Sequence, residues 1–271
     1  MHSEYSYDAK NTLGEIAERA TEFGYGKVGI TDHVNFNDEK FLGDLHASVA
    51  AVKEAQKKYP NMILGVELTP IELPEFNYIA KTGTREGYVP PIQSEPYGIE
   101  LAITKEEMIK LGIKYAIGAS HWRVDSAGAC EDDSDIDASM REWYRQQMWL
   151  AGDERVTILG HPWFHGKGLW YEDFSVIPKS MKSDIAAVLK ENGKYVELNA
   201  HFYRAPKATE KFKAQYSEYI RDMFEMGIPV TYGSDTHSNY HDERELAEKY
   251  LRAAGFQDGD IGEVCESDFF K

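Results

Sequence analysis

Apolar residues along this chain occur in two alternating patterns, short continuous runs and longer stretches with helical spacing. The stretch 11–23 shows the helical pattern, and Thr12 and Glu15 stand where a capping box would begin a helix. The apolar run 27–30 follows it and predicts a buried strand. Because such runs and helical stretches keep alternating without a polar linker, the pattern predicts repeated βα units around a parallel sheet.

The remaining elements follow the same rules. The predicted strands are 27–30, 62–66, 115–119, 156–159, 195–196 and 228–231. The predicted helices are 11–23, 41–58, 104–111, 138–150, 183–191, 210–226 and 242–254. The stretch 70–97 breaks the pattern with prolines at 70, 74, 90, 91 and 96, and it predicts an irregular excursion with a short hairpin near 77–89.

Residues of the metal-ligand types stand at the carboxyl ends of the predicted strands. They are His33, Glu67, His121, His161, Glu197, Asp235 and His237. Asp235 and His237 lie two positions apart, so an extended strand end would point both side chains at one spot. In a barrel of βα units the active site gathers at the carboxyl ends of the strands, so we expect these residues to lie together.

The mixture of donors indicates the kind of metal. Imidazole and carboxylate ligands together suit Zn, Mn and Fe, and a carboxylate such as Glu67 can bridge two metals. Such metals would polarise a phosphoryl oxygen and lower the pKa of a bridging water. Of the other histidines, His46 is expected to be an ordinary helix residue. For His165 and His201, a place in the pocket and a plain loop position are both open.

Composition narrows the class of protein. The formal net charge of -16 and the pI of about 5.0 predict a surface that repels phosphate backbones, so no long nucleic acid is expected as a partner. The chain has no G-x-G-x-x-G after the first strand and no phosphate loop, which disfavours a dinucleotide or P-loop site. Its two cysteines give no disulfide framework, and no apolar run predicts a signal peptide or a membrane span, so we expect a cytoplasmic protein.

The ordered set of motifs resembles the PHP family, named for polymerase and histidinol phosphatase domains. The matching segments are Thr31-Asp32-His33, Gly65-Val66-Glu67, Ser120-His121, His161-Pro162 and Ser234-Asp235-Thr236-His237. The resemblance spans nearly the whole chain, and it implies a single α/β domain, 1–271, folded as a distorted (β/α)7 TIM-like barrel. It also implies two or three divalent metal ions (Mn, Fe or Zn) at the carboxyl face of the barrel.

The beginning of the chain departs from the family pattern. The family begins with a His-x-His motif, and His2 resembles its second histidine. The first histidine would fall just before Met1, so either the chain as given begins late or one metal position is a ligand short. Asp8 stands where the family places a further His or Asp ligand, and a turn or a helix-capping role is its alternative.

The resemblance implies a role for each matching residue. The ligand sets for the metals are His121, His161 and Glu67; His33, Asp8 and His237; and His2, Glu67 and Asp235. Asp235 and His237 are also the expected catalytic residues, which would protonate the leaving alkoxide. Arg204 resembles the basic phosphate contact of histidinol phosphatases, with an exposed surface arginine as its alternative, and Arg123 and Lys167 are further candidates for substrate binding.

The chain length resembles that of free-standing histidinol-phosphate phosphatases. The resemblance therefore implies a hydrolase that cleaves a small-molecule phosphomonoester by attack of a metal-bridging hydroxide. Two alternatives stay open: a nucleotide or oligonucleotide phosphodiesterase or exonuclease of the same fold, and a non-catalytic metal-binding relic. We expect the stretch 70–97 and the aromatic residues Trp163, Phe164 and Trp170 to shape the pocket. The identity of the ester, the metal and the oligomeric state leave no trace in the sequence.

Overall fold

A curled, parallel sheet organises the chain. The structure, a computed structural model, describes residues 1–35, 39–89, 91, 97–121, 135–238 and 244–262. The strands of the sheet are β1 (Val28–Ile30), β2 (His33–Val34), β3 (Met62–Leu68), β6 (Tyr115–Gly118), β7 (Ile158–Leu159), β8 (Tyr195–Asn199) and β9 (Val230–Gly233). Their order is β1-β3-β6-β7-β8-β9, β2 also pairs with β3, and the pairs in this sheet are parallel. The predicted parallel α/β architecture is confirmed.

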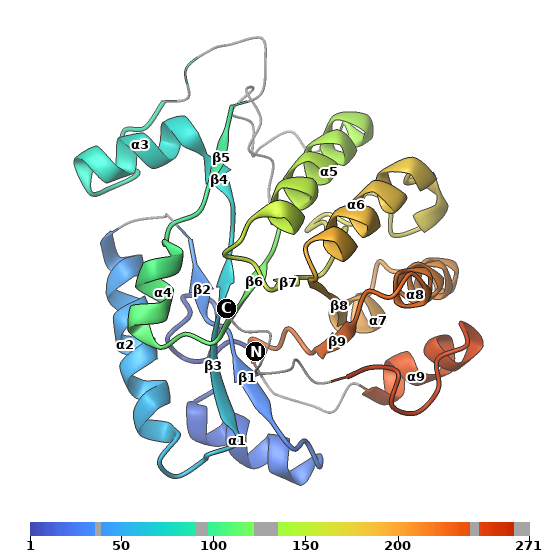
Figure 1. Ribbon diagram of the computed structural model, residues 1–271, viewed down its shortest axis with the longest axis horizontal. Coiled ribbons are helices and arrows are strands. Elements are labelled where there is room, and N and C mark those ends of the chain that lie inside the picture. Colours follow the sequence, from blue (N-terminus) through green and yellow to red (C-terminus); the bar gives the residue numbers. More distant parts are fainter. Residues whose placement is uncertain (36–38, 90, 92–96, 122–134, 239–243, 263–271) are drawn as a thin grey trace.

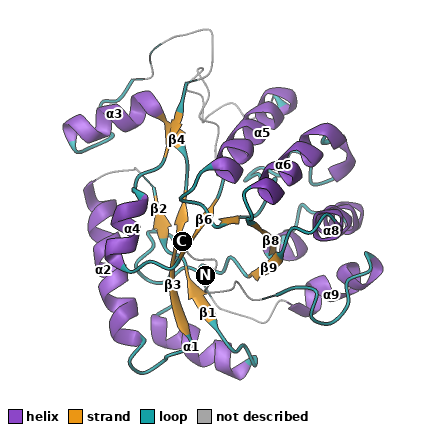
Figure 2. Cartoon of the chain, viewed as in Figure 1, coloured by secondary structure: helices purple, strands orange, loops and turns teal. Residues whose placement is uncertain are grey.

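Helices cover the outside of this half-barrel (Figure 1, Figure 2). They are α1 (Leu13–Glu22), α2 (Glu39–Ala55), α3 (Leu73–Thr82), α4 (Lys105–Leu111), α5 (Ile136–Gly152), the 3-10 turn η1 (Phe174–Val176), α6 (Lys179–Glu191), α7 (His201–Arg204), α8 (Glu210–Glu225) and α9 (Arg244–Ala253). The capping box noted in the sequence at Thr12 with Glu15 forms, and Thr104 and Glu107 form a second one. They satisfy backbone N–H groups that a helix start leaves without partners. No helix of the described part of the chain is long and apolar enough to cross a membrane.

The hairpin predicted near 77–89 is wrong, because α3 continues to Thr82 and no strand lies in this stretch. Pro74 lies in the first turn of α3, where a missing N–H does no harm, and Gly83 ends the helix in the left-handed conformation. The antiparallel pair of this region joins β4 (Ile71–Glu72) to β5 (Ile99–Glu100) instead. The sequence also missed the short elements β2 and α7, and α6 begins four residues before its predicted start.

Tyr115 packs against glycines of β1 and β3. Its ring lies over Gly65 of the neighbouring strand, and a Cβ atom built on Gly65 would lie 2.6 Å from the ring. A Cβ atom on Gly29 would lie only 1.9 Å from the Tyr115 hydroxyl oxygen. Ile117, Ile158 and Tyr195 pack with Tyr115 in a small apolar cluster. The two glycines are therefore needed for the space that the tyrosine takes.

The N-terminal segment lies between the ends of β1 and β9. The Thr31 N–H donates to the Met1 carbonyl at 2.8 Å, and the His2 N–H donates to the Thr236 carbonyl at 3.2 Å. The Lys10 N–H donates to the His237 carbonyl at 2.8 Å. No ladder joins β9 to β1 within the described ranges, so this segment bridges the two strands at their carboxyl ends.

Replacing Gly65 by alanine should destabilise the fold. The added methyl group would overlap the Tyr115 ring, and overpacking of a filled core costs about 1–3 kcal/mol. Urea unfolding measures the change. Gly152→Ala is the matched control, because a Cβ atom there meets no neighbour within 4 Å and its variant should be as stable as the wild type or slightly more so. Equal stability of the two variants would contradict this account of the interior.

Candidate metal centre

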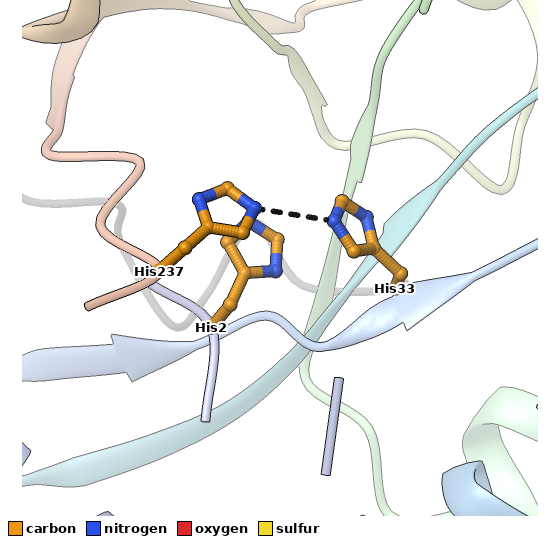
Figure 3. Close-up of side chains that lie close together, drawn as sticks. All are labelled: His2, His33 and His237. Atoms are coloured by element: carbon orange, nitrogen blue, oxygen red, sulfur yellow. Dashed lines mark hydrogen bonds between the residues drawn. The ribbon is translucent and has the colours of Figure 1, made fainter. Parts of the chain in front are cut away.

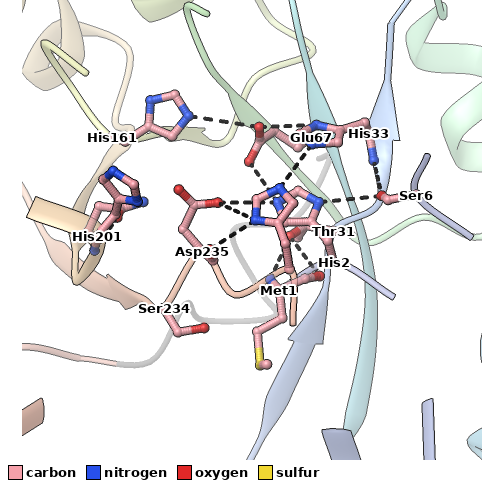
Figure 4. A network of polar contacts seen from close by, with 12 residues as sticks. Met1, His2, Ser6, Thr31, His33, Glu67, His161, His201, Ser234 and Asp235 are labelled. Atoms are coloured by element: carbon pink, nitrogen blue, oxygen red, sulfur yellow. Dashed lines mark hydrogen bonds and ion pairs between the residues drawn. The ribbon is translucent and has the colours of Figure 1, made fainter. Parts of the chain in front are cut away.

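The predicted ligands meet at the carboxyl ends of the strands (Figure 4). His33 begins β2, Glu67 lies near the end of β3, and His33 and Glu67 are partners in the parallel register. The others follow strand ends or belong to the N-terminal segment, and they are His2, Asp8, His121, His161, Asp235 and His237. The alternation of buried strands and outer helices thus brings the ends of the chain together in one place.

Glu67 lies at the centre of the cluster. Its Oε1 atom is 3.1 Å from His121 Nε2, 3.4 Å from His33 Nδ1 and 3.8 Å from His161 Nε2. Its Oε2 atom is 3.6 Å from His2 Nε2. The Glu67 residue is only 3% exposed, so its charge is shielded from water and depends on these neighbours.

Three groups of ligand atoms come close enough to hold a metal ion, with all atoms of a group within 4.8 Å. One is His2, Glu67 and Asp235, the same set that the sequence predicts. The others are His33, Glu67 and His121, and His2, His33 and His237 (Figure 3). Asp8 Oδ2 lies 3.4 Å from His33 Nε2 and 3.5 Å from His237 Nε2. The assignment of each residue to a particular metal stays a prediction.

The donor atoms fit divalent cations. Nε2 of His161 faces Nε2 of His121 at 3.2 Å, and Nε2 of His237 faces Nε2 of His33 at 3.4 Å. The His2 ring is stacked between His33 and His237, with ring centroids 4.1 and 4.2 Å apart. Nitrogen lone pairs packed this closely repel unless a proton or a cation lies between them. Imidazole nitrogen with carboxylate oxygen suits Zn, Mn or Fe.

The pKa values show how strongly these charges interact. Burial acts first to raise the pKa of Glu67, but hydrogen bonds to His121, His161 and His33 hold that pKa well below its ordinary value. Burial likewise lowers the pKa of His2 to about 4, assisted by the charge of His33. The Glu67 carboxylate is therefore ionised, whereas the His2 imidazole is neutral and keeps a lone pair that can bind a metal ion.

Asp32 does not join the cluster, although it belongs to the Thr31-Asp32-His33 motif. Its carboxylate accepts hydrogen bonds from Ser3 N at 2.6 Å, Ser3 Oγ at 2.7 Å, Ser48 Oγ at 2.5 Å and Ser6 Oγ at 3.3 Å. Asp32 therefore fixes the segment that carries His2. Sequence reasoning missed this role, and the serines at 3 and 6 were the signal that could have suggested it.

Two of the predicted ligands have strained backbones. The φ angle is 22° at His161 and 50° at Asp235, in the region that favours glycine. Arg204, predicted as a phosphate contact, donates from Nη1 to the Ser234 carbonyl at 3.3 Å and from Nη2 to the Asp235 carbonyl at 3.0 Å. These contacts place the guanidinium beside the centre and on the Asp235 backbone. Its role toward phosphate stays a prediction.

The other predicted substrate contacts lie in different surroundings. Lys167 is exposed, and its backbone carbonyl accepts a hydrogen bond from Lys207 Nζ at 3.0 Å. Arg123 lies outside the described residues. Glu197, the last of the residues predicted at strand exits, lies inside β8, which continues to Asn199. It accepts a hydrogen bond from the His161 N–H at 2.7 Å and belongs to none of the ligand groups found among the described residues.

The aromatic residues predicted to shape the pocket divide into two kinds. Trp163 and Trp170 are fully buried in the core, so their prediction as pocket residues is wrong, and His165 packs against Trp143 and Trp170 in the same core. Phe164 does face the centre. Its ring centroid lies 4.9 Å from that of His161 and 5.1 Å from that of His201. The turn after β7 sends neighbouring aromatic side chains to opposite sides.

Sheet and site together define a class, a parallel α/β half-barrel with a cluster of metal-type donors at the carboxyl ends of its strands. The sequence matches the PHP domain family over residues 1–201, and the chain belongs to this phosphoesterase family. The resemblance read from the motifs is thereby confirmed.

Two solved structures share the fold. A histidinol phosphate phosphatase of Lactococcus lactis subsp. lactis Il1403, complexed with zinc, L-histidinol and phosphate, has a TM-score of 0.60 at 16% identity, covering 95% of this chain and 92% of that one. A Listeria monocytogenes protein, described as a candidate histidinol phosphatase, has a TM-score of 0.61 at 13% identity, covering 88% and 93%. These identities show a common fold and no more. A search of curated proteins gave no match.

Replacing Asp32 by alanine should destabilise the protein strongly. It would leave buried hydroxyl and N–H groups without an acceptor, and losing several hydrogen bonds to a charged group costs about 2–4 kcal/mol. Urea unfolding of chelator-treated protein measures the loss. Ser48→Ala is the control, because it removes only one of these bonds and should cost about 1 kcal/mol. If Asp32→Ala lowered the free energy of unfolding no more than Ser48→Ala does, Asp32 would not be the residue that fixes the N-terminal segment.

Proposed function

We propose that the chain is a metal-dependent phosphatase that hydrolyses a small-molecule phosphomonoester. The observation that carries the proposal is the convergence of the predicted ligands around the buried carboxylate of Glu67. Membership of the PHP domain family supports phosphoester chemistry. The zinc, L-histidinol and phosphate in the Lactococcus structure support zinc as the metal and a histidinol-phosphate-like ester as the substrate.

Divalent metals, when bound, supply Lewis-acid chemistry at phosphoryl oxygens. Glu67, Asp235 and the histidines would hold these metals. Side chains at the edge of the cluster are partly exposed, 31% for His237 and 35% for Asp8, so a substrate reaches the centre from that side. His237 stands at this edge, and its Nδ1–H donates to the Asp235 carbonyl oxygen at 3.1 Å, which leaves the lone pair of Nε2 to hold a metal ion.

Phe164 is the proposed contact for the leaving group of the substrate. Phe164 stands over the His121 and His161 rings, and His201 packs against its other edge. An aromatic surface beside the metals would exclude water from the reacting phosphate and would contact an apolar or aromatic part of the leaving group. Arg204, beside Asp235, is the proposed contact for the phosphate oxygens.

Replacing His161 by alanine should lower kcat/KM for a phosphomonoester by on the order of 10³-fold, since Lewis-acid stabilisation is worth several kcal/mol and 1.36 kcal/mol is a factor of ten. The fold should persist, as circular dichroism would check. His46→Ala is the control, because His46 is exposed on α2 and belongs to none of the ligand groups found among the described residues. Unchanged turnover in the His161 variant would refute the proposal.

Metal content and substrate class can be tested together. Elemental mass spectrometry on protein purified without added metal or chelator should find more than one divalent metal per chain. The loaded protein should hydrolyse histidinol phosphate and p-nitrophenyl phosphate faster than a dinucleotide. Faster cleavage of the dinucleotide would instead identify a phosphodiesterase. Full metal content with no turnover of any of these esters would identify a binding protein without catalysis.

A further inference from the structure

We propose that Glu197 is a positioning residue that holds the His161 backbone in its strained conformation and thereby aims the His161 imidazole at the metal centre. This inference rests on the proposed metal-dependent function. Glu197 has the chemistry of a metal ligand and lies in the middle of β8, yet it belongs to none of the close ligand groups of the described chain. Its carboxylate instead accepts a hydrogen bond from the backbone N–H of His161.

The backbone of His161 is unfavourable on two counts. Its φ angle of 22° lies outside the regions that residues with a Cβ atom prefer, and such a conformation costs about 1–3 kcal/mol. The next residue is Pro162, which pushes the residue before it toward extended conformations. His161 therefore adopts this conformation only because its surroundings impose it.

Glu197 makes the hydrogen bond that holds the His161 backbone in this conformation. Its Oε2 atom accepts the His161 N–H at 2.7 Å and Asn199 Nδ2 at 3.0 Å. On the other side of the residue, the His161 carbonyl accepts the Phe164 N–H at 2.9 Å. The N–H and the carbonyl group of His161 are thus both held by hydrogen bonds, and the fixed backbone determines the direction of the imidazole.

The neighbouring strand is shaped to make room for this carboxylate. A Cβ atom on Gly233 would lie 1.7 Å from Glu197 Oε1, so only glycine leaves the space. Glu197 is only 4% exposed, and its carboxylate reaches from β8 to the His161 N–H at 2.7 Å. A side chain shorter by one methylene would retain the charge but could not reach the His161 N–H.

The test compares two conservative variants of Glu197, one that loses the negative charge and one that loses the length of the side chain. Glu197→Gln keeps an oxygen acceptor at the same reach and loses the charge, whereas Glu197→Asp keeps the charge and loses the reach. We expect the Asp variant to bind zinc about 10- to 100-fold more weakly at one position, the usual effect of removing a group that orients a ligand. The Gln variant should bind zinc much as the wild type does. Competition with a chelating dye measures both without any substrate.

Glu142→Asp is the matched control, because Glu142 is an equally buried carboxylate on α5 that pairs with Arg145. It should reduce stability toward urea and leave zinc affinity unchanged. Zinc affinity of the Glu197→Asp variant equal to that of the wild type would overturn the proposal, and so would a Gln variant as weak as the Asp variant. If the wild type binds zinc but hydrolyses no ester, only the proposed phosphatase function is refuted. The comparison of zinc affinities between the Glu197 variants and the wild type still tests the role of Glu197.

Discussion

The buried carboxylate of Glu67 is the constraint on which the rest of the structure depends. A charge removed from water is tolerable only when other groups compensate it, and the penalty for leaving it alone is several kcal/mol. The compensating groups come from distant parts of the chain, His33 from the end of the first strands and His121 and His161 from the middle. The N-terminal segment adds His2. A single side chain therefore couples the folding of most strand ends to one another.

The parallel sheet makes this assembly possible, because it delivers every strand exit to the same edge. The segment before β1 completes it. That segment bridges the ends of β1 and β9, and Asp32 holds it through hydrogen bonds from Ser3 and Ser6, while Ser48 of α2 donates to the same carboxylate. Residues at opposite ends of the chain, His2 and His237, can stack only because of this arrangement. The centre is a property of the whole topology, and no local stretch could form it alone.

Sequence patterns predicted the parts of this design that local rules govern. Buried runs located the strands, and a polar residue directly after each run located most of the site. The failures have physical causes as well. Pro74 was taken as a helix breaker, although the first turn of a helix accepts proline. Trp163 was assigned to the pocket because a run of aromatic residues does not reveal which of them a turn will send inward. The role of Asp32 depends on partners far away in the sequence.

The strained backbones explain why the cluster keeps its geometry. His161 and Asp235 both have positive φ angles, and a charged side chain binds the backbone of each, with Glu197 accepting the His161 N–H and Arg204 donating to the Asp235 carbonyl. The protein thereby holds donor nitrogens 3.2 and 3.4 Å apart, closer than their lone pairs favour. A divalent cation bound there would turn that repulsion into coordination. Because it would bind the folded arrangement and not the unfolded chain, it would also stabilise the fold.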